Sequence, residues 1–217
     1  VPFHFWAPDV YTGSPTSVTA FMATVVKIAA LAAFARLFGT CFPVQYWQNI
    51  VLVITTLTLL IPNITAVFQD NVKRMLAYSS VGQVGFILLL FVSKPTATTG
   101  IFYYLFAYSV ASLSTFNIVL MMESHGGNYL KNFNGLYKRN PLLAGIMAAG
   151  LMSLAGIPPF PGFFAKYFVF VEAMEAGYTY LVVVAILVSI VSVYYYFKVI
   201  IAMYWHAPED IAVVEIP

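Results

Sequence analysis

Long apolar runs, separated by short polar stretches, dominate this chain. Six of them are long enough for an α-helix to cross a bilayer, which takes about 20 residues. They cover residues 16–38, 46–68, 72–92, 100–122, 141–176 and 178–204. None shows the alternation of barrel strands, and only helices or closed barrels satisfy their backbone in lipid. The pattern predicts an all-α, polytopic transmembrane helix bundle, forming a single membrane domain over residues 1–217.

The composition agrees with this picture. Of the 217 residues, 61% are hydrophobic and 8% are charged, whereas a soluble globular domain carries about 25% charged residues. So few charges cannot cover a water-facing surface, and we expect most of the surface to face lipid. The net charge of +2 is small and dispersed, which argues against nucleic acid as a partner. No group of residues has metal-ligand spacing and no nucleotide-binding motif occurs, so neither ligand is expected.

Basic residues divide unequally between the two predicted membrane faces. One face receives Lys73, Arg74, Lys131, Lys138 and Arg139, with Lys198 near the end of the last run. The other face receives Arg36 and Lys94. The positive-inside rule places the first face in the cytoplasm or its organelle equivalent. Residues 1–15, interpreted as a proline-rich loop, fall on the same side.

The fifth apolar run cannot be one straight helix. Residues 141–176 would form a helix about 54 Å long, against about 30 Å of hydrocarbon. Within the run, three prolines remove backbone donors and clash with the preceding turn, and glycines flank them. These residues are Gly156, Pro158, Pro159, Pro161 and Gly162. They predict two half-helices with an unwound piece between them, an arrangement that recurs at transporter ion sites. A kink without function is the alternative.

Two lysines are predicted to lie deep in the membrane. Lys27 is near the middle of the first run, and Lys166 is about one turn into the second half-helix. A lysine at the centre of a spanning helix costs about 2.5–3.5 kcal/mol on insertion scales, because apolar surroundings disfavour the charged form. No carboxylate stands at mid-depth in the sequence. We therefore expect each lysine to take up and release protons; the alternative is a structural lysine paired with a carboxylate from elsewhere.

Other polar and aromatic residues of the spans have a structural interpretation as well as a functional one. The third span begins with Ser79, Ser80 and Gln83, and the fourth carries Ser109, Ser112 and Thr115 at three-residue spacing. Taken alone, they are expected in helix-packing contacts, but they would also complete a proton path. The aromatic residues Trp47, Tyr103, Tyr194, Tyr195 and Tyr196 fit the belts that anchor helices at membrane interfaces.

Several stretches resemble the antiporter-like subunit N of proton-pumping NADH:quinone oxidoreductase, the respiratory complex I. They are VPFHFWAPDVY at residues 1–11 with GSPT at 13–16, KRMLAYSS at 73–80, LAGIPP at 154–159 with GFFAK at 162–166, and YYY at 194–196. The first stretch is specific to subunit N. The lysine and broken-helix patterns are shared by all antiporter-like subunits. The resemblance covers essentially the whole chain.

The resemblance implies an antiporter-like fold, with a broken helix in an inverted repeat. Lys27 matches the central lysine of the family and Lys166 its second broken-helix lysine, whereas Gln83 stands where several relatives carry histidine. The chain begins at Val1 rather than Met, and the family has further helices before Val1 and after Pro217. We therefore expect a fragment whose N- and C-terminal parts are missing.

The function implied by the resemblance is proton translocation through Lys27 and Lys166, coupled to quinone reduction in sister subunits. The chain would be a non-redox subunit of a respiratory-chain translocase. It would bind no cofactor itself, while the assembled complex uses NADH and quinone in electron transport. Its partners would be other membrane subunits, the lipid bilayer and protons, in a bacterial inner membrane or an organelle membrane.

Two alternatives remain open at this point. One is a subunit of a multisubunit cation/proton antiporter or of a membrane-bound hydrogenase, which use the same helices and lysines without NADH. The stretch at residues 1–16 argues against it. The other is a scaffold without transport, whose lysines only pair across subunits.

Overall fold

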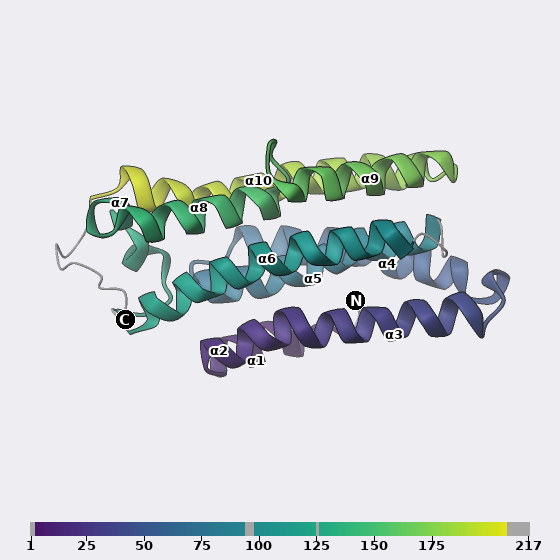
Figure 1. Cartoon of the computed structure of the whole chain (residues 1–217), viewed down its shortest axis with the longest axis horizontal. Helices are drawn as coiled ribbons and strands as arrows, with labels where there is room; N and C mark the ends of the chain where they lie inside the picture. Colours follow the sequence, from purple (N-terminus) through teal and green to yellow (C-terminus); the bar gives the residue numbers. More distant parts are fainter. Residues whose placement is uncertain (1–2, 94–97, 125, 208–217) are drawn as a thin grey trace.

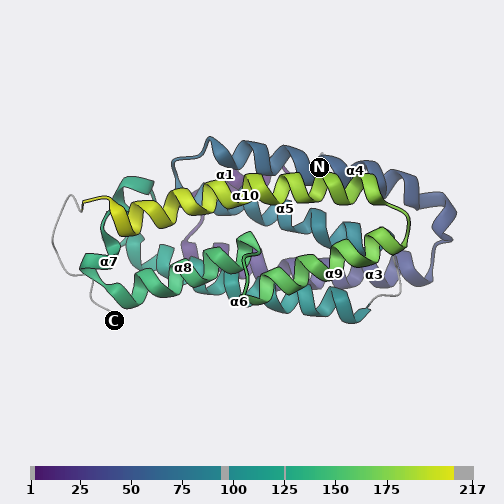
Figure 2. The same cartoon turned by 90° about the horizontal axis from the view of Figure 1, so that it is seen from above.

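The computed structural model describes residues 3–93, 98–124 and 126–207, and its long helices lie side by side along one axis (Figures 1 and 2). The N-terminal part contains α1 (Trp6–Gly13), α2 (Thr16–Phe21), the π-helix η1 (Met22–Val26), α3 (Lys27–Thr40), α4 (Val44–Val67) and α5 (Val72–Ser93). The C-terminal part contains α6 (Thr98–Glu123), the 3-10 helix η2 (Leu130–Phe133), α7 (Leu136–Arg139), α8 (Pro141–Ala155), α9 (Pro161–Glu175) and α10 (Thr179–Trp205).

Five helical stretches are long and apolar enough to cross a membrane. They are Thr16–Thr40, which joins α2, η1 and α3, then α4, α5, the stretch Thr99–Glu123 of α6, and α10. The helices α8 and α9 have 15 residues each, so each is about 22 Å long and too short to cross about 30 Å of hydrocarbon alone. They follow one another end to end (Figure 1). Together they occupy the range of the fifth predicted run, residues 141–176.

Local sequence explains several helix boundaries. The Oδ1 atom of Asn140 accepts the backbone N–H of the second and third residues of α8, each at 3.1 Å. Pro141 takes the first position, where a missing N–H costs nothing. One boundary differs from the expectation: residues 6–13 form α1, not a loop. Pro8 lies in the first turn of α1, and the first turn of a helix tolerates proline.

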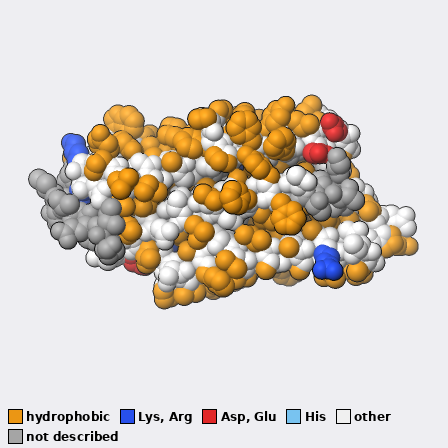
Figure 3. All heavy atoms as spheres, viewed as in Figure 1, with side chains coloured by type: hydrophobic (Ala, Val, Ile, Leu, Met, Phe, Trp, Pro, Cys, Tyr) orange, Lys and Arg blue, Asp and Glu red, His pale blue; other side chains and the backbone are white. Residues whose placement is uncertain are grey.

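The helix α5 is the centre of the bundle. Nearly all of its side chains are buried, and it packs against α1, α4, α6, α9 and α10 (Figure 2). In contrast, α3 has no fully buried residue. Apolar side chains cover the face shown in Figure 3, and the charged side chains visible there lie near the two ends of the bundle. This distribution is what a bundle surrounded by lipid requires.

The loops that carry most of the basic residues meet at one end of the bundle. There the Nζ atom of Lys198 donates to the Oδ1 atom of Asp70 at 2.8 Å, and the N–H of Gly135 donates to the carbonyl of Ala202 at 3.0 Å. These bonds join the α4–α5 connection, the segment before α7 and the end of α10. Lys94, expected at the opposite end, falls outside the described residues.

Three aromatic residues expected at the membrane interface lie inside the protein. Tyr195, Tyr196 and Trp47 are all buried, and the hydroxyl of Tyr195 donates to the Oδ1 atom of Asn63 at 2.9 Å. Tyr194 is exposed. The belt interpretation is therefore wrong for the three buried residues. Residue type alone does not tell which side of a helix faces the core.

Candidate functional site

Lys166 lies on α9, just after the break that separates α9 from α8. The residue is 4% exposed. Its Nζ atom donates to the carbonyl oxygen of Ala155, the last residue of α8, at 2.8 Å, and lies 4.8 Å from the centre of the Phe86 ring of α5. The carbonyl end of a helix and the face of an aromatic ring both favour a positive charge. Both are neutral groups, however, so neither of these described contacts supplies an opposite charge to the ammonium.

Two glycines let α8 and α9 come close enough to form this arrangement. Gly156 ends α8 with a φ of 84°, a conformation that favours glycine, and a Cβ atom there would lie 2.8 Å from the Cδ atom of Lys166. A Cβ atom on Gly162 would lie 1.8 Å from the carbonyl oxygen of Ser153. The N–H of Gly162 donates to the Oγ atom of the same serine at 3.2 Å. The predicted glycines are therefore required by close backbone approach.

The predicted prolines lie in and directly after the connection between the two half-helices. Pro158 and Pro159 are exposed in the connecting residues 156–160. Pro161 is the first residue of α9, where its lack of an N–H is tolerated. In Figure 1 the connection projects from the bundle near the middle of its length. The chain is thus interrupted at the predicted position, between α8 and α9.

Lys27 is the first residue of α3 and directly follows the π-helix η1. Its Nζ atom donates to the Oγ atom of Ser80 at 2.6 Å and lies 5.8 Å from the centre of the Tyr11 ring. The side chain is half-buried, since α3 leaves most of its surface uncovered. Within residues 3–93, 98–124 and 126–207, no carboxylate oxygen lies within 4 Å of the Nζ atom of Lys27 or of Lys166.

Three polar residues of α5 continue from the contact with Lys27. Ser79, Ser80 and Gln83 are all buried. Ser80 accepts the bond from Lys27, and the hydroxyls of Ser79 and Tyr196 form a hydrogen bond. Phe86, which touches Lys166, follows Ser80 by six residues, which is about 9 Å along the helix axis. The two lysines therefore contact the same helix at neighbouring levels.

A small cavity lies beside Lys166. Its volume is about 10 Å³, and the polar side chains around it include Gln83, Tyr104 and Tyr108. The hydroxyl of Tyr104 donates to the Oε1 atom of Gln83 at 2.5 Å. The hydroxyl of Tyr108 donates to the carbonyl oxygen of Ala23, one turn before Lys27, at 2.9 Å. A cavity of this size is at the lower limit for one water molecule, and Tyr108 joins it to the helix that carries Lys27.

The three hydroxyl residues predicted on the fourth span are less clearly placed for proton transfer. The Oγ atom of Ser109 donates to the carbonyl of Leu105 at 2.6 Å, and the Oγ1 atom of Thr115 donates to that of Ser112 at 2.9 Å. Hydroxyls inside helices commonly bond their own backbone in this way. These two bonds stay within α6, as the packing interpretation expects. A part in the proton path stays a prediction for all three residues.

The family model described as NADH:quinone oxidoreductase/Mrp antiporter, TM matches residues 1–192. The chain belongs to this family. With this membership and its apolar helices, the chain is an integral, multi-pass membrane protein.

Curated relatives in this family carry the name NADH-quinone oxidoreductase subunit N. The protein of Cytophaga hutchinsonii is 50% identical over 208 residues, which cover 94% of this chain and 46% of the relative. The protein of Flavobacterium johnsoniae is 42% identical and covers 97% of this chain and 48% of the relative. The chain thus spans about half the length of the curated relatives it matches.

Solved structures of antiporter-like subunits share the fold. A chain of respiratory complex I from Thermus thermophilus with bound aureothin matches with a TM-score of 0.88 and 36% identity, covering 100% of this chain and 48% of that one. A chain of the Mrp complex from Dietzia sp. matches with a TM-score of 0.90 and 30% identity, covering 96% of this chain and 40% of that one. The expected antiporter-like fold is confirmed, and both neighbours come from multisubunit membrane complexes.

Two tyrosines at the site went unrecognised in the sequence. Tyr104 and Tyr108 lie one turn apart on α6, are buried, and hydrogen-bond to α5 and η1. The available signal is their spacing of four residues in mid-span, because a buried tyrosine hydroxyl needs a partner. Such a pair indicates polar partners on the helices facing it.

Lys73 also differs from the expectation. The sequence predicts a loop charge at a membrane face, but the side chain of Lys73 is completely buried and its Nζ atom lies 3.4 Å from the Oε1 atom of Glu123. The sequence gives little sign of this, because Glu123 is 50 residues away, at the end of α6.

Proposed function

We propose that this chain is part of a proton-translocating membrane subunit of NADH:quinone oxidoreductase, in which Lys27 and Lys166 take up and release protons in turn. One observation carries the proposal: Lys166 is 4% exposed, and the described contacts of its ammonium are with neutral groups. A buried charge without a countercharge is costly. Releasing a proton removes that cost, and ionisable residues inside a membrane are mostly functional.

The contacts between the two lysines supply a route. A proton released by Lys27 would pass first to Ser80, which accepts its hydrogen bond. It would then pass along the group formed by Gln83 and the two tyrosines to the cavity beside Lys166. An amide does not titrate near neutral pH, so a water molecule in the cavity would carry the proton past Gln83.

The chain would contribute no redox centre to this reaction. Electron transfer from NADH to quinone would take place in sister subunits. Its free energy would reach the two lysines as an electrostatic or conformational change that alters their proton affinity. Moving one proton against 100 mV costs about 2.3 kcal/mol. Full burial of a lysine can change its proton affinity by more than that. In a bacterial cell, such as those of the curated relatives, the subunit would lie in the inner membrane.

An antiporter subunit is the second candidate, since the Mrp complex chain shares the fold with a TM-score of 0.90. Its identity is 30%, against 50% for the subunit N relative from Cytophaga hutchinsonii. The sequence similarity therefore favours the oxidoreductase. The genes beside this reading frame would separate the two, because they encode either quinone-reducing subunits or antiporter partners.

The test replaces Lys27 and Lys166 by alanine, singly and together, in the full-length subunit of an intact complex. Sealed membrane vesicles then report protons moved and NADH oxidised. We expect proton movement to fall at least about tenfold for each single variant, because losing a proton-transfer group costs roughly 10²–10⁴-fold at its step.

The matched control is Lys138→Ala, which removes an exposed lysine and should leave proton movement unchanged. Wild-type proton movement with both Lys27 and Lys166 replaced would overturn the proposal and leave only a scaffold.

A further inference from the structure

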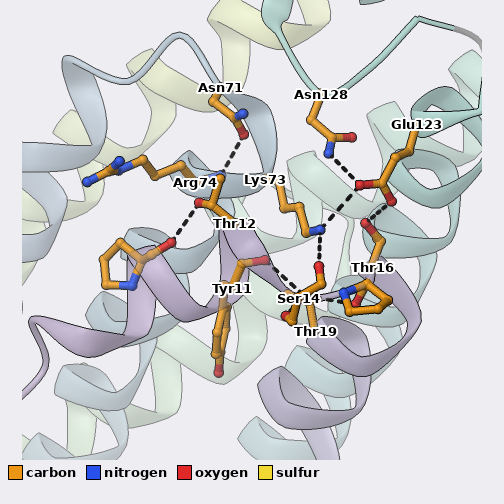
Figure 4. A network of polar contacts seen from close by, with 12 residues as sticks. Tyr11, Thr12, Ser14, Thr16, Thr19, Asn71, Lys73, Arg74, Glu123 and Asn128 are labelled. Atoms are coloured by element: carbon orange, nitrogen blue, oxygen red, sulfur yellow. Dashed lines mark hydrogen bonds and ion pairs between the residues drawn. The ribbon is translucent and has the colours of Figure 1, made fainter.

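A charged cluster lies where α5 begins and α6 ends, and Figure 4 shows its contacts. At its centre is Lys73 of α5, whose side chain is completely buried. The Nζ atom of Lys73 donates to the carbonyl oxygen of Ser14 at 2.6 Å and lies 3.4 Å from the Oε1 atom of Glu123. The side chain of Glu123 is 38% exposed. The cluster thus pairs a buried ammonium with a carboxylate that reaches the surface.

The carboxylate of Glu123 is held by three side chains. Besides Lys73, the Oγ1 atom of Thr16 donates to Oε2 at 2.5 Å, and the Nδ2 atom of Asn128 donates to Oε1 at 3.0 Å. Figure 4 shows these donors converging on the carboxylate from different elements. Charge-assisted bonds of this kind are the stronger hydrogen bonds in proteins. Glu123 is therefore fixed in position, although it ends its helix.

The two groups that the pair holds belong to one turn. Lys73 bonds Ser14, and Glu123 bonds Thr16; these residues flank Pro15 in the connection from α1 to α2. An ammonium from α5 and a carboxylate from α6 therefore form hydrogen bonds to the turn on both sides of the proline. We call Lys73, Glu123, Ser14 and Thr16 the turn clamp.

The turn clamp is joined to Lys27 through Tyr11. The hydroxyl of Thr19, on α2, donates to the carbonyl oxygen of Tyr11 at 3.0 Å and lies 2.9 Å from the hydroxyl of Ser14. Tyr11 is 1% exposed, and its ring centre lies 5.8 Å from the Nζ atom of Lys27. The position of α1, and of the tyrosine beside Lys27, thus depends on a turn that the clamp fixes.

We propose that Lys73 and Glu123 are positioning residues for proton transfer at Lys27: they fix the α1–α2 turn, and the turn holds Tyr11 beside Lys27. This inference rests on the proposed function, because it assigns the pair a part in the same reaction. An ammonium at this position donates to the Ser14 carbonyl and supplies the opposite charge to Glu123 at the same time, which accounts for a charged residue at a completely buried position. Arg74, the next residue, instead forms an exposed ion pair with Asp9.

The test uses the full-length subunit in the intact complex and measures protons moved per NADH oxidised in sealed vesicles. Glu123→Gln removes the countercharge of Lys73. We expect proton movement to fall about tenfold, less than the roughly 100-fold that a 1 Å misplacement can cost. Asp9→Asn makes the same chemical change at the exposed ion pair and should have no effect, since exposed pairs contribute little.

A second variant keeps both charges. Thr16→Val removes one of the three bonds to Glu123, and we expect proton movement to fall about threefold, because only part of the free energy of a hydrogen bond to a charged group would be transmitted to Lys27. Thr16→Ser keeps the hydroxyl and should restore wild-type movement. Thr65→Val, which removes a hydroxyl bonded only to its own helix in the described contacts, is the matched control.

A double variant tests the route through the tyrosine. Tyr11→Leu removes the ring beside Lys27, and adding Glu123→Gln to it should cause no further loss, because residues that act through one another are not additive. Losses that simply multiply would overturn the positioning role. So would wild-type proton movement in Thr16→Val and in Glu123→Gln while Lys27→Ala still abolishes proton movement.

If Lys27→Ala and Lys166→Ala both leave proton movement intact, the proposed function itself is wrong. Should Glu123→Gln fail to assemble, the threonine variants decide.

Discussion

The surroundings of Lys166 and of Lys27 differ in how completely this chain encloses them. Lys166 is 4% exposed, in contact with the end of α8 and a ring of α5. Lys27 is half-buried, and α3, which it begins, has no fully buried residue. One side of Lys27 touches Ser80 and Tyr11, while the other lies near the bundle surface.

This difference means that the two ammonium groups are solvated in different ways. The environment of Lys166 is set by described residues of this chain, through close backbone approach and a helix end. The environment of Lys27 also depends on whatever covers α3 in the membrane, either lipid or another protein. Changes near Lys166 should therefore act through the internal packing of this chain, and changes near Lys27 should respond to its neighbours.

The largest effect expected from this comparison concerns Gly162. A Cβ atom there would lie 1.8 Å from the carbonyl oxygen of Ser153, so Gly162→Ala must push α8 and α9 apart. We expect a loss of at least about 3 kcal/mol in stability, at the upper end for overpacking, seen as little assembled complex or a lower thermal midpoint. Gly145→Ala, with no atom within 4 Å of the new methyl, should be neutral or stabilising by up to about 1 kcal/mol. Equal behaviour of the two variants would show that the enclosed site is not close-packed.

A second prediction compares the two regions directly. Ala165, beside Lys166, is 3% exposed, whereas Ala30, one turn after Lys27, is exposed. Ala165→Leu should destabilise the subunit by about 2 kcal/mol through overpacking, and Ala30→Leu by less than about 0.5 kcal/mol if lipid covers α3. Thermal unfolding of the purified complex measures both. A large effect at Ala30 would show that protein, not lipid, packs on α3.

The smallest effect concerns Ser80, the polar side chain of α5 that accepts a hydrogen bond from Lys27. Ser80→Ala removes the acceptor of the 2.6 Å bond from Lys27. We expect proton movement to fall about tenfold, since a hydrogen bond to a charged group contributes roughly 1.5 kcal/mol or more and about 1.4 kcal/mol is a factor of ten. Ser189→Ala removes a hydroxyl that bonds its own helix and should have no effect. Unchanged pumping in Ser80→Ala would mean that Lys27 does not use α5.

The helices and the break in the fifth run follow from the sequence because they depend on local properties. Apolar length predicts the long helices, and the glycines and prolines of residues 156–162 predict the interruption. The closeness of Lys166 to the end of α8 also follows, because Lys166 comes only four residues after Gly162, where the break ends. The length of the apolar runs and the backbone properties of glycine and proline are enough to predict these features.

The partners across helices could not be predicted in the same way. Ser79 and Tyr196 form a hydrogen bond although 117 residues separate them, and 107 residues separate Thr16 from Glu123. Such contacts depend on the rotation of each helix about its axis, and a run that is apolar all round gives no amphipathic stripe to fix that rotation. For this reason the sequence predicts interfacial positions for the buried tyrosines and a loop position for Lys73, and the structure shows all three inside the bundle.

The π-helical turn η1, at Met22–Val26, has a consequence for how the direction of Lys27 is set. A π turn holds one residue more than an α turn, and each residue of a helix rotates the next by about 100°. The stretch after η1, which carries Lys27, is therefore offset by one residue, about 100° around the helix axis, from where a continuous α-helix beginning at Thr16 would place it. Removing a single residue within Met22–Val26 would swing the ammonium away from α5 by about a quarter of a revolution while leaving the upstream contacts in place.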